Sequence, residues 1–284
     1  MAVETTSSAA HGWAPDITYH VPGDVLPEAL LLRASTVAAS IEGDAPVVRA
    51  TFIDDADAGF VAEGAEIPEA DPDLDEIEIP TRKVSQLVKV SRELYGQPET
   101  ANQLAQSVAR ALTRKADLAF VAQAAPVSPA VAPVAGLANQ SGIVTSTARL
   151  DVSLDALVDM VAELQDNGAL PSHLLVSPSS WALISKFKTG TGSNQALVSS
   201  TGVQEAAVLR LNGLEVVVNS AVPAGKALVV DSTAVISAAG QVMVAVSEHA
   251  AFSSDSILVR GTWRIGHGLP RADRLGILDV GPEA

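Results

Sequence analysis

The residues that could carry chemistry form short motifs, and the first of these is a serine–lysine stretch. Residues 185–190 read Ser-Lys-Phe-Lys-Thr-Gly, which contains both the S-x-x-K and the K-T-G patterns of serine penicillin-binding enzymes. In those enzymes the two patterns lie on separate elements and supply different residues to one site. Here both patterns would have to share Lys188. We therefore interpret the stretch as the end of a helix that runs into a loop.

A second motif has the acidic spacing of a calcium-binding loop. Residues 71–75 read Asp-Pro-Asp-Leu-Asp. The sixth position should be glycine and is Glu76, and the twelfth should be glutamate and is Arg82. We interpret this motif as a solvated acidic turn, which leaves open only loose cation binding between copies of the chain.

Other catalytic and cofactor signals are incomplete. Gly190 and Gly192 lack the third glycine of a dinucleotide loop, and the chain has no P-loop, no G-x-S-x-G elbow and no cysteine. The five histidines show no metal-ligand spacing: His11, His20, His173, His249 and His267. We therefore expect no cofactor and no metal. A net charge of −15 also argues against sequence-independent binding to nucleic acid.

The elements that would position any site are a mixture of helices and strands. A long helix is expected over residues 99–123, where apolar residues recur at spacings of three and four and alanine is abundant. Further helices are expected after Ser153 and from Pro178. The remainder is mostly strands, with Asn212-Gly213 as a hairpin signal and Ala239-Gly240 separating two strands.

The charge of residues 47–94 is one-sided. No lysine or arginine lies between Arg49 and Arg82, and basic residues then return together. The acidic residues of the interval are Asp54, Asp55, Asp57, Glu63, Glu66, Glu69, Asp71, Asp73, Asp75, Glu76 and Glu78. Residues 83–91 alternate as a half-buried strand does. We expect an antiparallel ribbon with an acidic outward arm and a basic return arm, supported by another copy because an isolated ribbon is only marginally stable.

Several short motifs occur in a characteristic order between Val25 and Val280. They are Ala-Asp-Ala-Gly-Phe-Val-Ala-Glu-Gly at 56–64, the strand at 83–94 that ends in Ser-Arg-Glu-Leu, Pro-Val-Ala-Gly-Leu at 133–137, Val-Ser-Pro-Ser-Ser-Trp at 176–181, and Leu-Asn-Gly-Leu-Glu-Val-Val-Val at 211–218. In this order and spacing the chain resembles the major capsid proteins of tailed bacteriophages.

The resemblance implies an α+β phage major capsid fold with four parts. These are an N-terminal arm (1–45), an extended β-hairpin loop (46–94), a peripheral domain with a long spine helix (95–137 and 237–284) and an axial domain (138–236). The extended loop would lie over a neighbouring subunit. The polar stretch 189–194 would face the five- or six-fold axes.

The function that the resemblance implies is structural. The subunit would self-assemble through pentamers and hexamers into an icosahedral phage head around double-stranded DNA, without sequence-specific contact. Implied partners are a portal, an optional cement or decoration protein, and a separate scaffolding protein, the last because only residues 1–24 precede the first expected helix. The expected location is the virion, after assembly in the cytoplasm of the bacterial host and without a membrane span.

One departure from the family concerns covalent reinforcement. Some members crosslink their subunits covalently through an isopeptide bond between a loop lysine and an asparagine near the C-terminus. The matching positions here are Ile67 and Asp255, so we predict that no such bond forms. The residues expected at the non-covalent contacts are Phe52, Phe60, Val61, Asp71, Asp73, Asp75, Arg82, Lys83, Arg110 and Arg114, with Lys115 as a further partner for the acidic arm.

Two other functions stay open at this point. An encapsulin-like shell would share the fold and package a cargo enzyme. A hydrolase with an unrecognised site would need a pocket with convergent polar groups. A β-rich surface or tail protein is disfavoured, because it would have more than 4% aromatic residues and no long alanine-rich helix.

Overall fold

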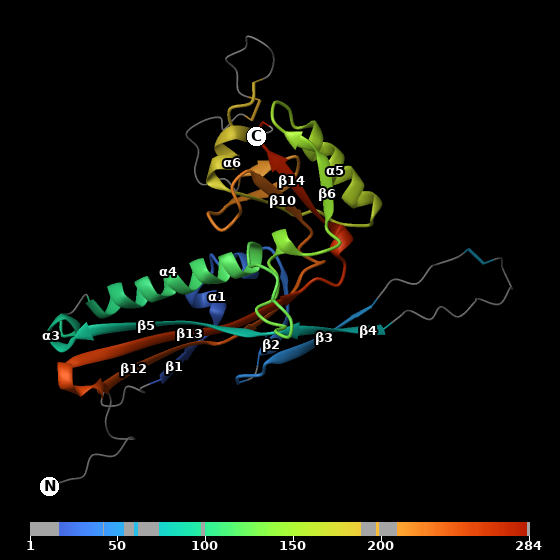
Figure 1. Cartoon of the computed structure of the whole chain (residues 1–284). Helices are drawn as coiled ribbons and strands as arrows, with labels where there is room; N and C mark the ends of the chain where they lie inside the picture. Colours follow the sequence, from blue (N-terminus) through green and yellow to red (C-terminus); the bar gives the residue numbers. More distant parts are fainter. Residues whose placement is uncertain are drawn as a thin grey trace, which may run out of the picture.

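The computed structural model describes residues 17–41, 43–53, 60–61, 74–97, 100–188, 197–198 and 209–282. These residues form two six-stranded sheets, a separate two-stranded ribbon and the long helix α4 (Thr100–Val121). The first sheet runs alongside α4, and the second sheet lies beyond the C-terminal end of that helix (Figure 1). The expected α+β class and the expected long helix are both confirmed.

The first sheet has the strand order β1-β12-β13-β11-β2, and β5 joins it by pairing with β13. Its strands are β1 (Ile17–His20), β2 (Thr36–Ile41), β5 (Arg82–Ser91), β11 (Ile236–Gly240), β12 (Val242–Ala251) and β13 (Ser256–Gly268). Helix α4 packs on one face of this sheet. Gly261 permits the close approach, since a Cβ atom there would lie 2.4 Å from Cγ1 of Val108. Trp263 is buried on the same face, and its Nε1 donates to the Gly240 carbonyl at 2.9 Å.

The second sheet has the order β6-β14-β10-β7-β9-β8. Its strands are β6 (Val144–Leu150), β7 (His173–Val176), β8 (Arg210–Leu211), β9 (Leu214–Val218), β10 (Lys226–Val230) and β14 (Leu275–Val280). Helix α5 (Asp155–Asp166) buries Leu157, Met160 and Leu164 in the core of this unit. Helix α6 (Pro178–Ile184) begins at a Ser177 cap, so the helices expected after Ser153 and from Pro178 are confirmed.

Six short helical segments complete the described chain. They are α1 (Pro22–Val25), α2 (Leu30–Arg33), α3 (Arg92–Tyr95) and the 3-10 turns η1 (Leu137–Asn139), η2 (Phe252–Ser254) and η3 (Ala272–Arg274). Asp117 on α4 ties α2 to the second unit. Its Oδ1 accepts from the Leu30 backbone N–H at 2.8 Å and its Oδ2 accepts from Nδ2 of Asn219 at 2.8 Å. Burial, opposed by these two hydrogen bonds, raises the pKa of Asp117.

The ribbon consists of β3 (Val47–Ile53) and β4 (Leu74–Pro80), which pair from Val47–Pro80 to Ile53–Leu74. The expectation that residues 83–94 form its return arm is wrong. Strand β5 instead pairs with β13 along its whole length, because its apolar face carries Val84 and Val88 into the core beneath α4. The alternation of β5 predicts a half-buried strand correctly, but alternation alone does not specify the partner strand.

Two further expectations differ from the structure. Residues 237–284 were expected in the peripheral unit, but β14 pairs with β10 and β6 in the second sheet, where it is buried between them. Ala239-Gly240 was expected to separate two strands, but both residues continue β11.

The Asp117 tie gives a first prediction. In Asp117→Asn, an amide N–H₂ would face another donor in either orientation, either the Leu30 N–H or Nδ2 of Asn219. Asn219 cannot flip because its Oδ1 accepts from the Ala221 N–H at 2.8 Å. We expect the unfolding free energy of the unassembled subunit to fall by about 1–3 kcal/mol, as for an unsatisfied buried polar group. Urea denaturation measures this change. The matched control, Asp159→Asn on the exposed face of α5, should change stability by less than about 0.5 kcal/mol.

His267 on β13 gives a second prediction. It is fully buried, its Nε2 donates to the Ala135 carbonyl at 2.9 Å, and burial lowers its pKa from 6.5 to about 4. Between these values the unfolded chain binds a proton and the folded chain does not. Stability should therefore fall as pH drops from 6.5 to 4, with a contribution on the order of 3 kcal/mol.

Urea denaturation of His267→Gln over the same pH range checks this contribution. The variant keeps a neutral hydrogen-bond donor and cannot titrate. The difference in stability between wild type and variant should therefore shrink on acidification. A difference that does not change with pH contradicts the assignment.

Candidate intersubunit surfaces

The motifs with catalytic or metal-binding spacing do not assemble a site in the described part of the chain. The Ser185 hydroxyl donates to the Trp181 carbonyl at 2.8 Å, directly after the end of α6. Lys188 is exposed, and residues 189–196 lie outside the described residues. Across the described ranges, no three His, Asp or Glu side chains gather as metal ligands, and no helix is long and apolar enough to cross a membrane.

The described side chains among the residues expected at contacts on the ribbon lie in two environments. Phe52 is half-buried and packs against a small core that joins Ala50 and Ile79 of the ribbon to Ile236 and Ala238 of β11. Phe60 is fully exposed at 112%, and Val61 is also exposed. Asp75 pairs through its backbone with Phe52. The Asp75 side chain, together with Asp71 and Asp73, lies outside the described residues.

The root of the ribbon is held on β13 by hydrogen bonds. Nη1 of Arg264 donates to Oγ1 of Thr81 at 2.9 Å and to the carbonyl of Ala45 at 3.3 Å. The Thr81 N–H donates to the Pro46 carbonyl at 2.8 Å, and this hydrogen bond joins the start of β3 to the end of β4. Gly266 lets the ribbon pack against the strand, since a Cβ atom there would lie 2.7 Å from the Pro80 carbonyl oxygen.

Arg82 and Lys83, expected at contacts with other copies, lie on β5 and have partners within their own chain. Nε of Arg82 donates to the Ala132 carbonyl at 3.2 Å. Nζ of Lys83 donates to Oδ2 of Asp44 at 2.9 Å, and this hydrogen bond is the main cause that lowers the pKa of the exposed Asp44 carboxyl. Asp44 also lies 3.4 Å from Nε of Arg264, so the Lys83 pair belongs to the ribbon root.

The face of the first sheet opposite α4, which we call the outer face, presents exposed residues beyond the ribbon root. Leu87 on β5 is 63% exposed there and pairs with Arg260 on β13. Lys89 is the next outward residue of β5. Lys89 and Arg260 are exposed and form no ion pair with any described residue.

Arg260 was not among the residues expected from the sequence, because only its pairing with β5 places it beside Leu87 and Lys89. The alternation of residues 83–91 does contain the signal for Lys89, which points to the same side of β5 as Leu87. The root residues Asp44, Thr81 and Arg264 were also missed, and no local sequence pattern marks them.

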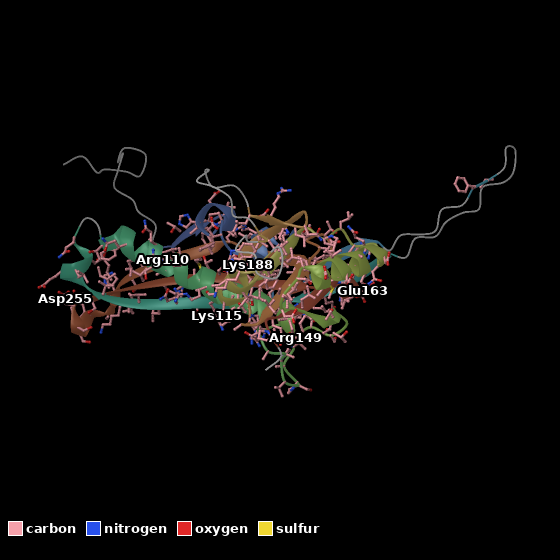
Figure 2. The ribbon with its side chains drawn as sticks, turned by 90° about the horizontal axis from the view of Figure 1, so that it is seen from above. Arg110, Lys115, Arg149, Glu163, Lys188 and Asp255 are labelled. Atoms are coloured by element: carbon pink, nitrogen blue, oxygen red, sulfur yellow. The ribbon has the colours of Figure 1, made fainter. Side chains whose placement is uncertain are left out.

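A second basic surface lies on α4. Arg110, Arg114 and Lys115 are exposed along this helix, and Figure 2 marks Arg110 and Lys115 on it. Arg110 and Arg114 border a hollow that also includes Glu28. Neither arginine forms an ion pair within the described residues. Two cationic surfaces are therefore available to an acidic segment of another copy.

Comparisons with known proteins bear on this arrangement. No curated protein matches the chain. Three solved structures share the fold: the capsid of an empty GTA particle (17% identity, TM-score 0.66, covering 99% of this chain and 96% of that one), a chain from Gordonia phage Cozz (13%, 0.67, 99% and 92%), and a chain from Mycobacterium phage Bobi (18%, 0.63, 90% and 91%). At these identities the structures establish the fold alone.

The family follows from a different comparison, which uses the sequence. The model of the phage capsid family matches residues 23–279, which is most of the chain. This range includes α4, the ribbon and the strands of both sheets apart from β1 and the last residue of β14. The chain therefore belongs to the phage capsid family and is a major capsid protein, a structural subunit of a virion shell.

Proposed function

We propose that this subunit assembles through pentamers and hexamers into an icosahedral head around double-stranded DNA, and that its ribbon is a non-covalent strap on a neighbouring copy. The observation that carries the proposal is the ribbon itself. It leaves the subunit beyond the first sheet (Figure 1), and Arg264 on β13 holds its root. A projecting two-stranded ribbon is marginally stable by itself, so an adjacent copy supplies the surface that it needs.

Charge complementarity favours the outer face as the receiving surface. The interval between Arg49 and Arg82 contains only acidic charges, and the outer face presents Lys89 and Arg260 without partners among the described residues. The exposed Leu87 between them offers an apolar contact for ribbon residues such as Phe60. The acidic strap and the cationic face thus have matching chemistry.

The position of the ribbon root gives a second reason to prefer the outer face over α4. Even-numbered residues of β13 share one side of the strand. Arg264 and Gly266 on that side already hold the root of the chain's own ribbon, and Arg260 lies on the same side. A neighbour's ribbon would therefore extend a surface on which ribbon already packs against sheet. We propose Arg110, Arg114 and Lys115 as secondary contacts.

The remaining partners follow from the family and from charge. With a net charge of −15, the subunit repels the phosphate backbone, which suits a shell that encloses DNA without holding it by sequence. We propose that a portal and a scaffolding protein take part in assembly in the host cytoplasm, and that a cement protein reinforces the shell where non-covalent contacts alone are weak. The proposed role requires no catalytic activity.

Negative-stain microscopy tests assembly, and denaturing electrophoresis tests whether covalent crosslinks join the subunits. The protein, supplied with its scaffolding protein, should form closed shells on the order of tens of nanometres across, because closed symmetry buries every copy of the interface. Shells boiled in SDS should release a single species of 29.1 kDa. A compact monomer by negative-stain microscopy contradicts assembly, and a ladder of covalent oligomers contradicts the non-covalent strap.

Charge reversal tests which surface receives the ribbon. The double variant Lys89→Glu with Arg260→Glu should lower the yield of shells, because two attractive pairs per copy become repulsive. Each exposed pair contributes only about 0.2–1 kcal/mol, but every copy loses it. Wild-type shells should also weaken as salt rises. Light scattering and sedimentation measure both effects.

The matched control for this experiment is Arg110→Glu with Arg114→Glu, which changes the net charge equally on α4. It should reduce the yield less than the reversal on the outer face. The opposite order, with the α4 variant abolishing assembly and the outer-face variant assembling normally, would show that α4 receives the ribbon.

A further inference from the structure

The segment after α4 is unusual because it lacks charge. Residues 118–148 contain no Asp, Glu, Lys, Arg or His, although the chain as a whole is 18% charged. Part of this segment is buried, but residues 127–131 are exposed. After the end of α4 the segment passes in front of the first sheet in the view of Figure 1. An exposed stretch with no charged residue of its own on so acidic a protein calls for a physical explanation, and its nearest cation is Arg82, which donates to the Ala132 carbonyl at the base of the loop.

We propose that residues 126–131, here called the neutral loop, form a self-contact of the shell: the same loop from two or more copies meets around a symmetry axis. This inference rests on the proposed shell assembly and goes beyond it by assigning a second contact, distinct from the ribbon. The partner is another copy of this chain, and the surface that it presents is the neutral loop itself.

The tip of the neutral loop is apolar and exposed. Val127 is 83% exposed and Val131 is 66% exposed. The Ala130 N–H donates to the Val127 carbonyl at 2.9 Å, which closes a turn between them. Two exposed valines on one turn, with no charged residue in the segment that carries them, offer an apolar contact of the kind found at the centre of protein interfaces.

The two stems of the loop are held firmly, which fixes the tip in place. The Gly136 N–H donates to the Gln123 carbonyl at 2.8 Å and joins one stem to the other. The Ala135 carbonyl accepts from Nε2 of the buried His267 at 2.9 Å and from Nε2 of Gln140 at 2.8 Å. A loop that is ordered before it binds loses less conformational entropy when a partner arrives.

Symmetry explains why the loop is neutral. A residue that lies close to a symmetry axis also lies close to the same residue of the next copy, so a charge at that place faces a like charge. Contacts between different surfaces have no such restriction and can use opposite charges, as the ribbon and the outer face do. Since the whole chain carries −15, a charge-free exposed loop is a surface at which identical copies can meet without repulsion.

A single introduced cysteine tests the self-contact directly, because the chain has no cysteine of its own. A disulfide needs Cα atoms within about 7 Å, so a one-cysteine variant forms one only where identical positions meet. We expect at least one of Val127→Cys, Ala130→Cys and Val131→Cys, assembled and oxidised, to give a band at twice the monomer mass. Val152→Cys is the control, since Val152 is 72% exposed but lies beside Asp151 in the second unit, and it should stay monomeric.

The outcomes separate this inference from the proposed function. If wild-type shells form while all three loop variants assemble and remain monomeric in SDS, the self-contact is overturned and shell assembly stands. If wild-type protein forms no shells, the proposed function fails first. A Val152→Cys dimer equal to those of the loop variants would also overturn the inference, because it would indicate random collision.

Complementary charges provide an independent test. Val127→Asp and Val127→Lys should each lose most of the shell yield, while the melting temperature of the free subunit stays unchanged because the side chain is exposed. An equal mixture of the two variants should recover shells, since opposite charges can then meet at the axis. The proposal is wrong if each variant assembles as well as wild type, or if the mixture does no better than either variant alone.

Discussion

The two faces of β13 set the constraint on which the rest of this subunit depends. Odd-numbered residues such as Gly261 and Trp263 lie beneath α4, where Gly261 leaves room for Val108. Even-numbered residues face the other way, where Arg264 and Gly266 hold the root of the ribbon. Because successive side chains of a strand point to opposite faces, one strand builds the core and anchors the projecting ribbon together. A shift of one residue in its register would exchange these roles.

A shell of identical acidic copies requires two kinds of contact, and we assign them to different parts of the subunit. Different surfaces can attract each other by opposite charge, which we assign to the acidic ribbon and to Lys89 and Arg260 on the outer face. Identical surfaces repel if they are charged, which we assign to the neutral loop with Val127 and Val131 at its tip. Electrostatics therefore explains both the one-sided ribbon and the uncharged segment of the same chain.

The sequence predicts the elements of this fold better than their partners. Periodicity identifies α4 and the half-buried strand β5, because these patterns depend on which face is buried. It does not reveal that β5 pairs with β13, nor that β14 enters the second sheet, since pairing depends on contacts distant in sequence. The same limit explains why Phe60 and Arg110 could be identified as exposed candidates while Arg260 and the root residues could not. Arg82 and Lys83 stay predicted contacts between copies, but the sequence does not reveal their partners within the chain, Ala132 and Asp44, because these lie far away along the chain.

The central claim is that the ribbon of one copy lies on the outer face of another. A cryo-electron microscopy map of the assembled shell, at a resolution that traces the backbone, tests it most directly. The account predicts that the acidic segment between β3 and β4 of a neighbour crosses the outer face beside Lys89 and Arg260. A map in which that segment crosses α4 beside Arg110 and Arg114, with the outer face bare, would contradict it.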